Sequence, residues 1–412
     1  MIRPGTLLMI ALLSCASVAN GFVLPVERLT ADPDVDYTDK LPVVAGDRVA
    51  WFRGWGVTLQ DGADRTDLAY DQGHGYGWDL GLSDSIVAWI SCSYYDAGCF
   101  GPALFVYDGV EIALIADSFV PGTPIPMSLD VDGDRVVWAA YDGEIRLTEN
   151  GVTTLITDQA GAMAPAAKDP AIHGSRIVWH VGDQVFLYDG VETVPVFDDP
   201  NRTSGVGDLD VSDDGVAWSY YDGVDTRAYY FDGVEAVDVS QGNVYAPGVS
   251  LSGHRLVWAA SDGADYEIYS WSGGAVDPLS DNDFNDLGPV AMGEATAWMA
   301  NPGPSTHGEV FYNDGVSSQR VTFSDYLKFS LTGGPGGRIA WVGCPDAPEG
   351  PQHDTCYEDT GHVVFAVNWD VFVAPEPDAA PLGVFASISL AGVGRRRWSR
   401  GSITPPRRWG SR

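Results

Sequence analysis

The stretch Gly253-His254-Arg255-Leu256-Val257-Trp258-Ala259-Ala260 reads as a tight turn that leads into a short apolar strand. Val249 to Ser252, just before it, alternates apolar and small polar residues and predicts a preceding strand. Glycine at position 253 suits the turn, because glycine accepts the positive φ that tight hairpins demand. The two segments together predict an antiparallel hairpin.

Two more strands follow in the same unit. Asp262-Gly263 marks a second turn, and Tyr266 to Trp271 predicts a third strand. Ser272-Gly273-Gly274 then leads to a fourth strand, Ala275 to Ser280. The unit from Pro247 to Asp281 is therefore expected to be a four-stranded antiparallel sheet.

The same unit recurs along the chain, each time with a tryptophan at the end of its second apolar run. The spacings between successive tryptophans are 38, 49, 41, 39, 40, 40 and 43 residues. This period is typical of a four-stranded propeller blade and is too long for most helical solenoids. We predict an all-β fold, a single β-propeller of eight four-stranded blades; seven blades stay possible if the first or last unit is irregular. The tryptophans are Trp51, Trp89, Trp138, Trp179, Trp218, Trp258, Trp298 and Trp341.

The two ends of the repeat array differ from the pattern. The last unit supplies Arg338 to Val342 and Val363 to Val367 but no clear fourth strand after Asp370. Val26 to Thr30 has the fourth-strand pattern, so we expect this N-terminal segment to pair with the last unit and close the ring. The first unit lacks a clear fourth strand between Gly73 and Leu80.

The order of strand, Gly-x-Arg, apolar run, Asp-Gly, Glu-Ile-Tyr and Leu-Ser resembles TolB-type propeller repeats. Glu267-Ile268-Tyr269 and Leu279-Ser280 carry the resemblance best, and it spans residues 26–373. Tryptophan stands where that family usually has phenylalanine at the end of the second strand. The resemblance implies blade architecture, and it leaves function open, because such scaffolds include binding proteins, enzyme accessory domains and lyases.

The net charge is unevenly distributed along the chain. The whole sequence carries −34, whereas residues 1–21 carry +1 and residues 375–412 carry +5, which leaves −40 on residues 22–374. A body this acidic repels nucleic acid and anionic membrane surfaces, so no nucleic-acid partner is expected. Divalent cations and basic partners are the compatible ligands. Solvation of an extracellular surface is the simpler explanation, since most of the acidic residues occupy turn positions.

The N-terminus predicts export. Arg3 precedes the apolar run Thr6 to Ser14, and Ser17-Val18-Ala19 supplies the small residues of a cleavage site, so residues 1–19 are expected to be a secretory signal peptide. Lipidation at Cys15 is the alternative. The propeller is then assigned to residues 22–374.

Four cysteines stay in the exported chain: Cys92, Cys99, Cys344 and Cys356. Their even number fits an oxidising compartment. Each pair is close in sequence and follows a tryptophan-bearing strand, so we expect Cys92–Cys99 and Cys344–Cys356 disulfides in loop insertions. A zinc site is the alternative, and no histidine at finger-like spacing supports it.

The C-terminus has three parts. Pro375-Glu376-Pro377 is followed by the mostly apolar run Ala379 to Gly394 and then by Arg395-Arg396-Arg397. The run is shorter than the about twenty residues that a membrane-spanning helix needs. Residues 375–400 resemble a PEP-CTERM sorting signal, which implies recognition by a membrane-bound sorting enzyme in a Gram-negative bacterium and delivery to the cell surface or the extracellular matrix. Residues 401–412, a basic tail, continue past the point where such signals normally stop; a plain C-terminal anchor is the alternative.

Motifs for catalysis are absent from the sequence. There is no G-x-S-x-G elbow, no phosphate-binding loop and no H-E-x-x-H. His180 follows a tryptophan strand and His254 sits in a turn, so both are interpreted as structural or surface residues. Catalytic residues therefore stay unassigned, although histidines from different blades could still converge at the channel with a metal.

Two acidic clusters could bind Ca²⁺, because alternating oxygen ligands suit that ion. One contains Asp32, Asp34, Asp36 and Asp39, and the other contains Asp281, Asn282, Asp283, Asn285 and Asp286. Neither has the length or the closing glutamate of an EF-hand loop. Both also occupy turns, where aspartate and asparagine are favoured without any ligand.

Two functions follow from these observations. The favoured hypothesis is a monomeric, non-enzymatic surface protein that binds an extracellular protein or polysaccharide; its other contacts would be the export and sorting machinery, with the membrane approached only through the C-terminal segment. The alternative is a propeller enzyme, such as a polysaccharide lyase or glycan hydrolase. Three or more His, Asp or Glu side chains at one channel mouth would favour the enzyme.

Overall fold

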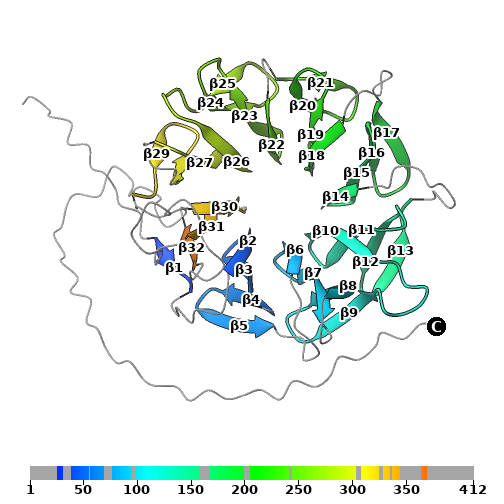
Figure 1. Ribbon diagram of the computed structural model, residues 1–412. Coiled ribbons are helices and arrows are strands. Elements are labelled where there is room, and N and C mark those ends of the chain that lie inside the picture. Colours follow the sequence, from blue (N-terminus) through cyan, green and yellow to red (C-terminus); the bar gives the residue numbers. More distant parts are fainter. Residues whose placement is uncertain are drawn as a thin grey trace, which may run out of the picture.

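The eight repeat tryptophans lie in the second strands of eight antiparallel sheets, which stand around a common axis in the computed structural model (Figure 1). The described residues contain strands and no helix. The chain therefore forms an eight-bladed β-propeller. The structure describes residues 26–30, 39–54, 56–68, 77–94, 99–157, 168–198, 205–240, 244–302, 308–323, 328–334, 336–343 and 363–368.

Each blade is a meander in which successive strands pair from the axis outward. Blades 1 to 4 comprise β2 (Asp39–Ala45), β3 (Arg48–Arg53), β4 (Gly56–Asp61) and β5 (Asp64–Leu68); β6 (Gly77–Leu82), β7 (Val87–Tyr94), β8 (Cys99–Tyr107) and β9 (Ile112–Asp117); β10 (Pro126–Asp132), β11 (Arg135–Ala140), β12 (Ile145–Glu149) and β13 (Val152–Leu155); and β14 (Lys168–His173), β15 (Arg176–Val181), β16 (Gln184–Tyr188) and β17 (Thr193–Asp198).

The second half of the ring repeats this order, and only its last blade is completed by a strand from the other end of the chain. Blades 5 to 8 comprise β18 (Gly205–Val211), β19 (Val216–Tyr221), β20 (Thr226–Phe231) and β21 (Ala236–Asp238); β22 (Val244–Ser252), β23 (Arg255–Ser261), β24 (Tyr266–Trp271) and β25 (Val276–Pro278); β26 (Asp286–Met292), β27 (Ala295–Ala300), β28 (Glu309–Asn313) and β29 (Ser318–Arg320); and β30 (Lys328–Gly333), β31 (Arg338–Gly343), β32 (Val363–Asn368) and β1 (Glu27–Arg28).

Ring closure by the N-terminal segment is confirmed. β1 pairs antiparallel with β32, and Leu29 N donates to Val364 O at 2.9 Å. The Val364 amide in turn donates to Thr30 Oγ1 at 3.0 Å. Blade 6 makes the same contact within one continuous unit, where the Ile268 amide donates to Ser280 Oγ at 2.8 Å. The N-terminal segment thus replaces a missing fourth strand contact for contact, which gives eight complete blades.

The expectation for the first unit is wrong in one respect. Its fourth strand exists, but it is β5, which lies before Gly73 and pairs with β4 across the turn at Gly62. Asp64 to Asp67 are exposed, so this edge strand has the charged composition of a loop. Gly77–Leu82, which overlaps the segment between Gly73 and Leu80, is instead the first strand of blade 2.

The tryptophans form the packed layer between the blades. All eight are between 0 and 3% exposed. Six stack on the aromatic residue opposite them in the third strand, with ring centroids 5.5 to 6.2 Å apart. Each buried aromatic side chain contributes about 3–5 kcal/mol of stability against truncation to alanine. The tryptophan that recurs in each repeat of the sequence is thus a buried core residue in each blade.

Arginine in the Gly-x-Arg motif connects neighbouring blades. Arg176 Nη1 donates to Ser212 O in the next blade at 2.7 Å. Arg338 Nη1 does the same across the closing junction, donating to Asp47 O of blade 1 at 2.5 Å. A hydrogen bond from a charged donor contributes about 1.5–3 kcal/mol. These contacts hold the ring at the face where the first and second strands meet.

Candidate functional site

The first strand of every blade is interrupted by a register shift. Leu41, Asp169 and Ser330 adopt φ values of 47°, 49° and 53° at these shifts, and Gly288 adopts 59°. Positive φ is strained for residues with side chains. Because four blades share this conformation, it belongs to the repeat and is no special property of the one aspartate among them.

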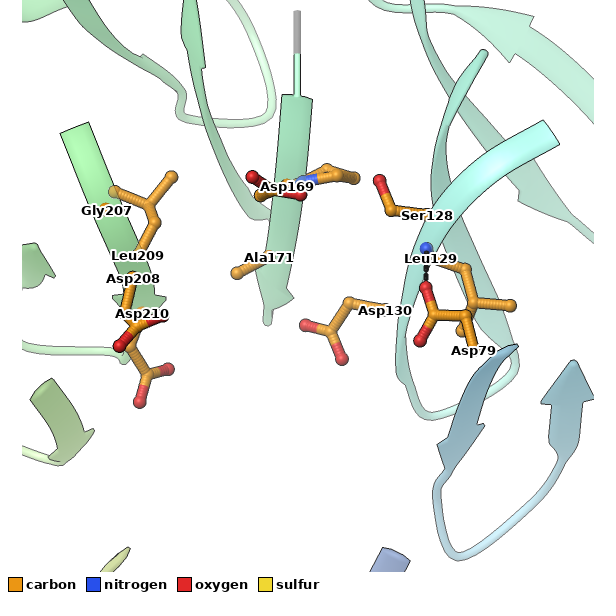
Figure 2. Close-up of a pocket in the computed structure, with 11 residues that line it drawn as sticks. Asp79, Ser128, Leu129, Asp130, Asp169, Ala171, Gly207, Asp208, Leu209 and Asp210 are labelled. Carbon is orange, nitrogen blue, oxygen red and sulfur yellow. Dashed lines mark hydrogen bonds between the residues drawn. The ribbon is translucent and has the colours of Figure 1, made fainter. Parts of the chain in front are cut away.

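A pocket of about 500 Å³ lies against the first strands of blades 2 to 5, that is β6, β10, β14 and β18. Figure 2 shows Asp79 and Asp130 on one side, Asp208 and Asp210 on the other, and Asp169 on the strand between them. None of the lining residues is basic. They are Asp79, Ser128, Leu129, Asp130, Asp169, Pro170, Ala171, Gly207, Asp208, Leu209 and Asp210.

Two of the aspartates join one blade to the next. Asp130 Oδ1 accepts the amide of Val131 at 2.8 Å, and its Oδ2 accepts the amide of Ile172 in blade 4, also at 2.8 Å. Asp210 repeats this arrangement and accepts the amide of Leu251 in blade 6 at 2.8 Å. Both carboxyls therefore have a structural role as well as a place in the pocket.

A second pair of aspartates lies two positions earlier in the repeat. Asp79 Oδ2 accepts the amide of Leu129 in blade 3 at 2.7 Å. Asp208 accepts the amides of Gly248 and Val249 in blade 6. The acidic wall is thus built from two levels of the first strand, each tied to the following blade.

Asp169 differs from the other four because it makes no contact of this kind in the described residues. Its Oδ2 lies 3.3 Å from His180 Nε2 of the same blade, and its side chain is 66% exposed. The hydrogen bond to His180 lowers the pKa of Asp169 despite partial burial. Asp169 is therefore the ionised and accessible carboxylate of the pocket.

Burial raises the pKa values of the other four pocket aspartates. Desolvation raises the pKa of Asp130 to about 7 and the pKa values of Asp79 and Asp210 to about 6, although two backbone amides bond each of them. Repulsion from Asp169 adds to the rise at Asp79, and repulsion from Asp210 and Asp79 adds to the rise at Asp130. Desolvation also raises the pKa of Asp208. A cationic group in the pocket would favour ionisation of all four.

Acidic residues at these two levels occur on blades 2 to 5 only. One level is the first-strand residue that pairs with the residue just before the blade's tryptophan. The other level is the residue two positions earlier in the same first strand. On the other half of the ring they are neutral, so the inner wall is polarised. The neutral residues are Leu41, Val43, Gly248, Ser250, Gly288, Val290, Ser330 and Thr332.

The residues predicted to bind Ca²⁺ do not come together where the structure describes them. Asp281 and Asp283 are exposed, whereas Asp286 is fully buried. Asp32, Asp34 and Asp36 lie outside the described residues. Across the described ranges, no three or more His, Cys, Asp or Glu side chains are grouped so that they could hold a metal ion.

Other sequence predictions fall partly or wholly outside the described part of the chain. Cys92 and Cys99 lie on the paired strands β7 and β8, where the partners in register are Pro102 for Cys92 and Tyr94 for Cys99. Within the described ranges, no helix is long and apolar enough to cross a membrane. Outside them are Cys344 and Cys356, the predicted signal peptide, and the residues of the predicted sorting signal, Pro375, Glu376, Pro377, Arg395, Arg396 and Arg397.

The histidines found in the described part do not converge. His180 is buried in β15 against Asp169, and His173 faces Asp213 at 3.5 Å. His254 lies 3.9 Å from Asp214 in an exposed turn. The several channel histidines that a lyase of the TolB-like kind would need are not assembled among these residues.

Sequence reasoning missed all five pocket aspartates. The available signal was the tripeptide Leu-Asp-Val just before the turn that leads into the tryptophan strand, at Leu129-Asp130-Val131 and again at Leu209-Asp210-Val211. Identical residues two blades apart indicate a shared contact. Asp169 gives no such signal, because its role depends on His180.

The sequence matches no family model, and no curated protein is significantly similar to it. Among solved structures, the computationally designed protein Ika8 is similar, with 15% identity, a TM-score of 0.54, and coverage of 81% of this chain and 97% of the designed one. The β-propeller domain of the Trilobed protease from Pyrococcus furiosus aligns with 11% identity and a TM-score of 0.49 over 70% of this chain and 99% of that domain. An acylaminoacyl peptidase from Pyrococcus horikoshii aligns with 11% identity and a TM-score of 0.46, over 78% of this chain and 61% of the peptidase. At these identities the likeness extends to the propeller fold alone.

Proposed function

We propose that this protein is an exported, non-enzymatic binding module of the cell surface or extracellular space, and that the acidic pocket binds a cationic group of its partner. The propeller fold provides a rigid ring that presents the pocket. The predicted signal peptide and the sorting-type C-terminus support the location. TolB-type repeats, which the blades resemble, occur in binding proteins.

The observation that carries the proposal is the set of five aspartates on four consecutive blades around one pocket without a basic lining residue. Such a wall attracts a guanidinium or ammonium group, which bonds to several carboxylates at once. The partner is thus a protein that offers an Arg or Lys side chain, or a polysaccharide with free amino groups.

The number of carboxylates meets the condition given above for an enzyme, but their contacts favour binding. Asp79, Asp130 and Asp210 each accept backbone amides from two blades, which commits them to structure. No serine, cysteine or histidine nucleophile pairs with a base in the pocket lining. The pocket is arranged to hold positive charge.

Titration calorimetry tests the proposal. An Arg-containing hexapeptide and a fully deacetylated glucosamine oligosaccharide are titrated into the full chain at low ionic strength, and the acetylated oligosaccharide serves as the neutral probe. We expect binding of at least one cationic probe, weakened by salt, and none of the neutral probe. Absence of heat with both cationic probes would contradict the function proposed here.

One observation favours an enzyme as the second candidate. The same pocket holds a carboxyl with a raised pKa, Asp130, and one with a lowered pKa, Asp169. A pair of this kind can act as general acid and base in glycoside hydrolysis. Release of reducing sugar from acidic or neutral glycans, lost in Asp130→Asn and Asp169→Asn, would support this alternative.

A further inference from the structure

The junctions between blades 6 and 7 and between blades 7 and 8 contain a buried glutamate at the same place in the repeat. Glu267 in β24 and Glu309 in β28 both pair with the residue two positions after the blade's tryptophan. They are 2% and 3% exposed. Each carboxyl also meets the hydroxyl that follows the fourth strand, Ser280 and Thr322 respectively. The two junctions can therefore be compared directly.

The partner from the next blade differs between the two junctions. Lys328, the first residue of β30, places Nζ 3.1 Å from Glu309 Oε2, and its side chain is fully buried. Arg320 Nη2 adds a second cation at 3.0 Å from Glu309 Oε1. The position equivalent to Lys328 in blade 7 is Asp286, because both residues pair with the residue two after the tryptophan. One junction has an ion pair, and the other has two acids.

The two acids are in direct contact. Asp286 is 0% exposed and its carboxyl is hydrogen-bonded to that of Glu267. Asn282 bonds both, with its amide N 2.6 Å from Glu267 Oε1 and its Nδ2 2.7 Å from Asp286 Oδ2. A direct bond between two carboxyl groups requires a proton on one of them.

We propose that the junction between blades 6 and 7 is a proton-controlled contact, in which Glu267 and Asp286 share one proton and the junction is destabilised when that proton is lost. Deprotonation leaves two buried carboxylates facing each other, and the proton goes to solvent. The inference is independent of the function proposed for the pocket, which lies on blades 2 to 5.

Among the described residues, the groups that contact the pair include no cation. The groups that face the pair are Ser280, Asn282 and Trp298, which are neutral, and Tyr269. The nearby turns add further acids, Asp265 and Asp281. Desolvation by burial therefore raises the pKa of Glu267 from 4.5 to about 7 and also raises that of Asp286. The native state then holds a proton that the unfolded chain releases, so the contact loses stability as the pH rises from 4.5 through about 7.

The test compares Glu267→Gln with Glu309→Gln in the full chain, by thermal unfolding between about pH 5 and pH 9. Glutamine imitates the protonated glutamic acid, so we expect Glu267→Gln to match the wild type near pH 5 and to melt about 2 °C higher near pH 8. Glu309→Gln breaks an ion pair and is expected to lower the Tm throughout this range. Infrared spectra should show a protonated-carboxyl band at the lower pH that is weaker in Glu267→Gln.

Two results would overturn the proposal. One is a Tm for Glu267→Gln that stays parallel to the wild type at every pH. The other is stabilisation of the wild type, but not of Glu267→Gln, by added Ca²⁺ at alkaline pH, which would mean that the two carboxylates bind a metal ion in place of the proton. Asp286→Asn provides a second variant should Glu267→Gln fold poorly, and it is expected to show the same loss of pH dependence.

Discussion

The Asp130 carboxylate of blade 3 accepts the backbone amide of Ile172 in blade 4 at 2.8 Å. Ser250 makes the corresponding contact between blades 6 and 7, where its hydroxyl accepts the amide of Ala291 at 3.1 Å. At these two junctions the acceptor is thus an acid in one case and a hydroxyl in the other. The charge of Asp130 is an addition to the structural requirement.

Truncation of Asp130 to alanine is therefore expected to destabilise the protein by about 1–3 kcal/mol, because the buried Ile172 amide loses its acceptor. Asp130→Ser keeps an acceptor without the charge and is expected to cost less. Chemical denaturation at constant pH measures both. Equal losses in the two variants would mean that the hydrogen bond is not what the junction needs.

The pH dependence of stability follows from the same aspartates. The pKa values of Asp79, Asp130 and Asp210 rise from 3.8 to between about 6 and 7 on folding, so their contribution is complete below pH 3.8 and is lost as the pH rises through 6 to 7.

Turn aspartates such as Asp189 and Asp232 make a contribution of opposite sign to the pH dependence of stability. Backbone amides lower their pKa below 3.8, so they stabilise the fold above that pH and lose the effect as the pH falls further. We expect the Tm to be highest near about pH 5 and to decline towards pH 8. A Tm that rises steadily to pH 8 in a differential scanning experiment would contradict this sign.

A substitution at Thr30 tests ring closure by removing one hydrogen-bond acceptor, Thr30 Oγ1. Thr30→Ala removes the acceptor of the Val364 amide at the junction of β1 and β32, and we expect a loss of about 1–3 kcal/mol in denaturant unfolding. Thr30→Ser keeps the hydroxyl and is expected to be near wild type. If alanine and serine behave alike, the N-terminal segment does not close the ring through this contact.

Asp169→Asn tests ligand binding without loss of structure. Asparagine tolerates positive φ nearly as well as aspartate, and Asp169 accepts no amide from another blade among the described residues. We expect the affinity for a cationic peptide to fall about 10-fold while the Tm stays nearly constant. Asp134→Asn, in an exposed turn, is the matched control with the same change of net charge. Equal effects of the two variants would indicate attraction to the whole acidic surface.

Affinity for a cationic ligand is expected to rise with pH. Ionised carboxylates bind the cation, and Asp79, Asp130 and Asp210 lose their protons between pH 6 and about 7. Calorimetry in buffers of different ionisation enthalpy should show that protons are released on binding near pH 6. No proton release would mean that the ligand contacts Asp169 alone.

The fold was predictable because the tryptophan that marks each repeat is also the residue that packs between blades. Trp258 signals the blade in the sequence and is 1% exposed in the structure. The fourth strand of the first unit was not predictable in the same way, since Asp64 to Asp67 face solvent and have no apolar period. Composition identifies buried strands better than exposed ones.

The pocket could not be predicted from the sequence, for a different reason. Asp79 and Asp208 are far apart in the chain and line the same pocket only because the blades form a ring. Their positions within each repeat could be compared, but the direction of a first-strand side chain depends on the register shift inside that strand. Three-dimensional convergence therefore had to come from the structure.

The closing strand has a mechanical consequence. β32, which ends at Asn368, lies inside its sheet, between β31 on one side and β1 on the other. A pulling force on the C-terminal side of β32 would act on a strand held by two ladders, so both ladders would have to break before the strand is released. A surface protein tethered by its C-terminus would withstand drag better with this arrangement than with a tether at an outer strand.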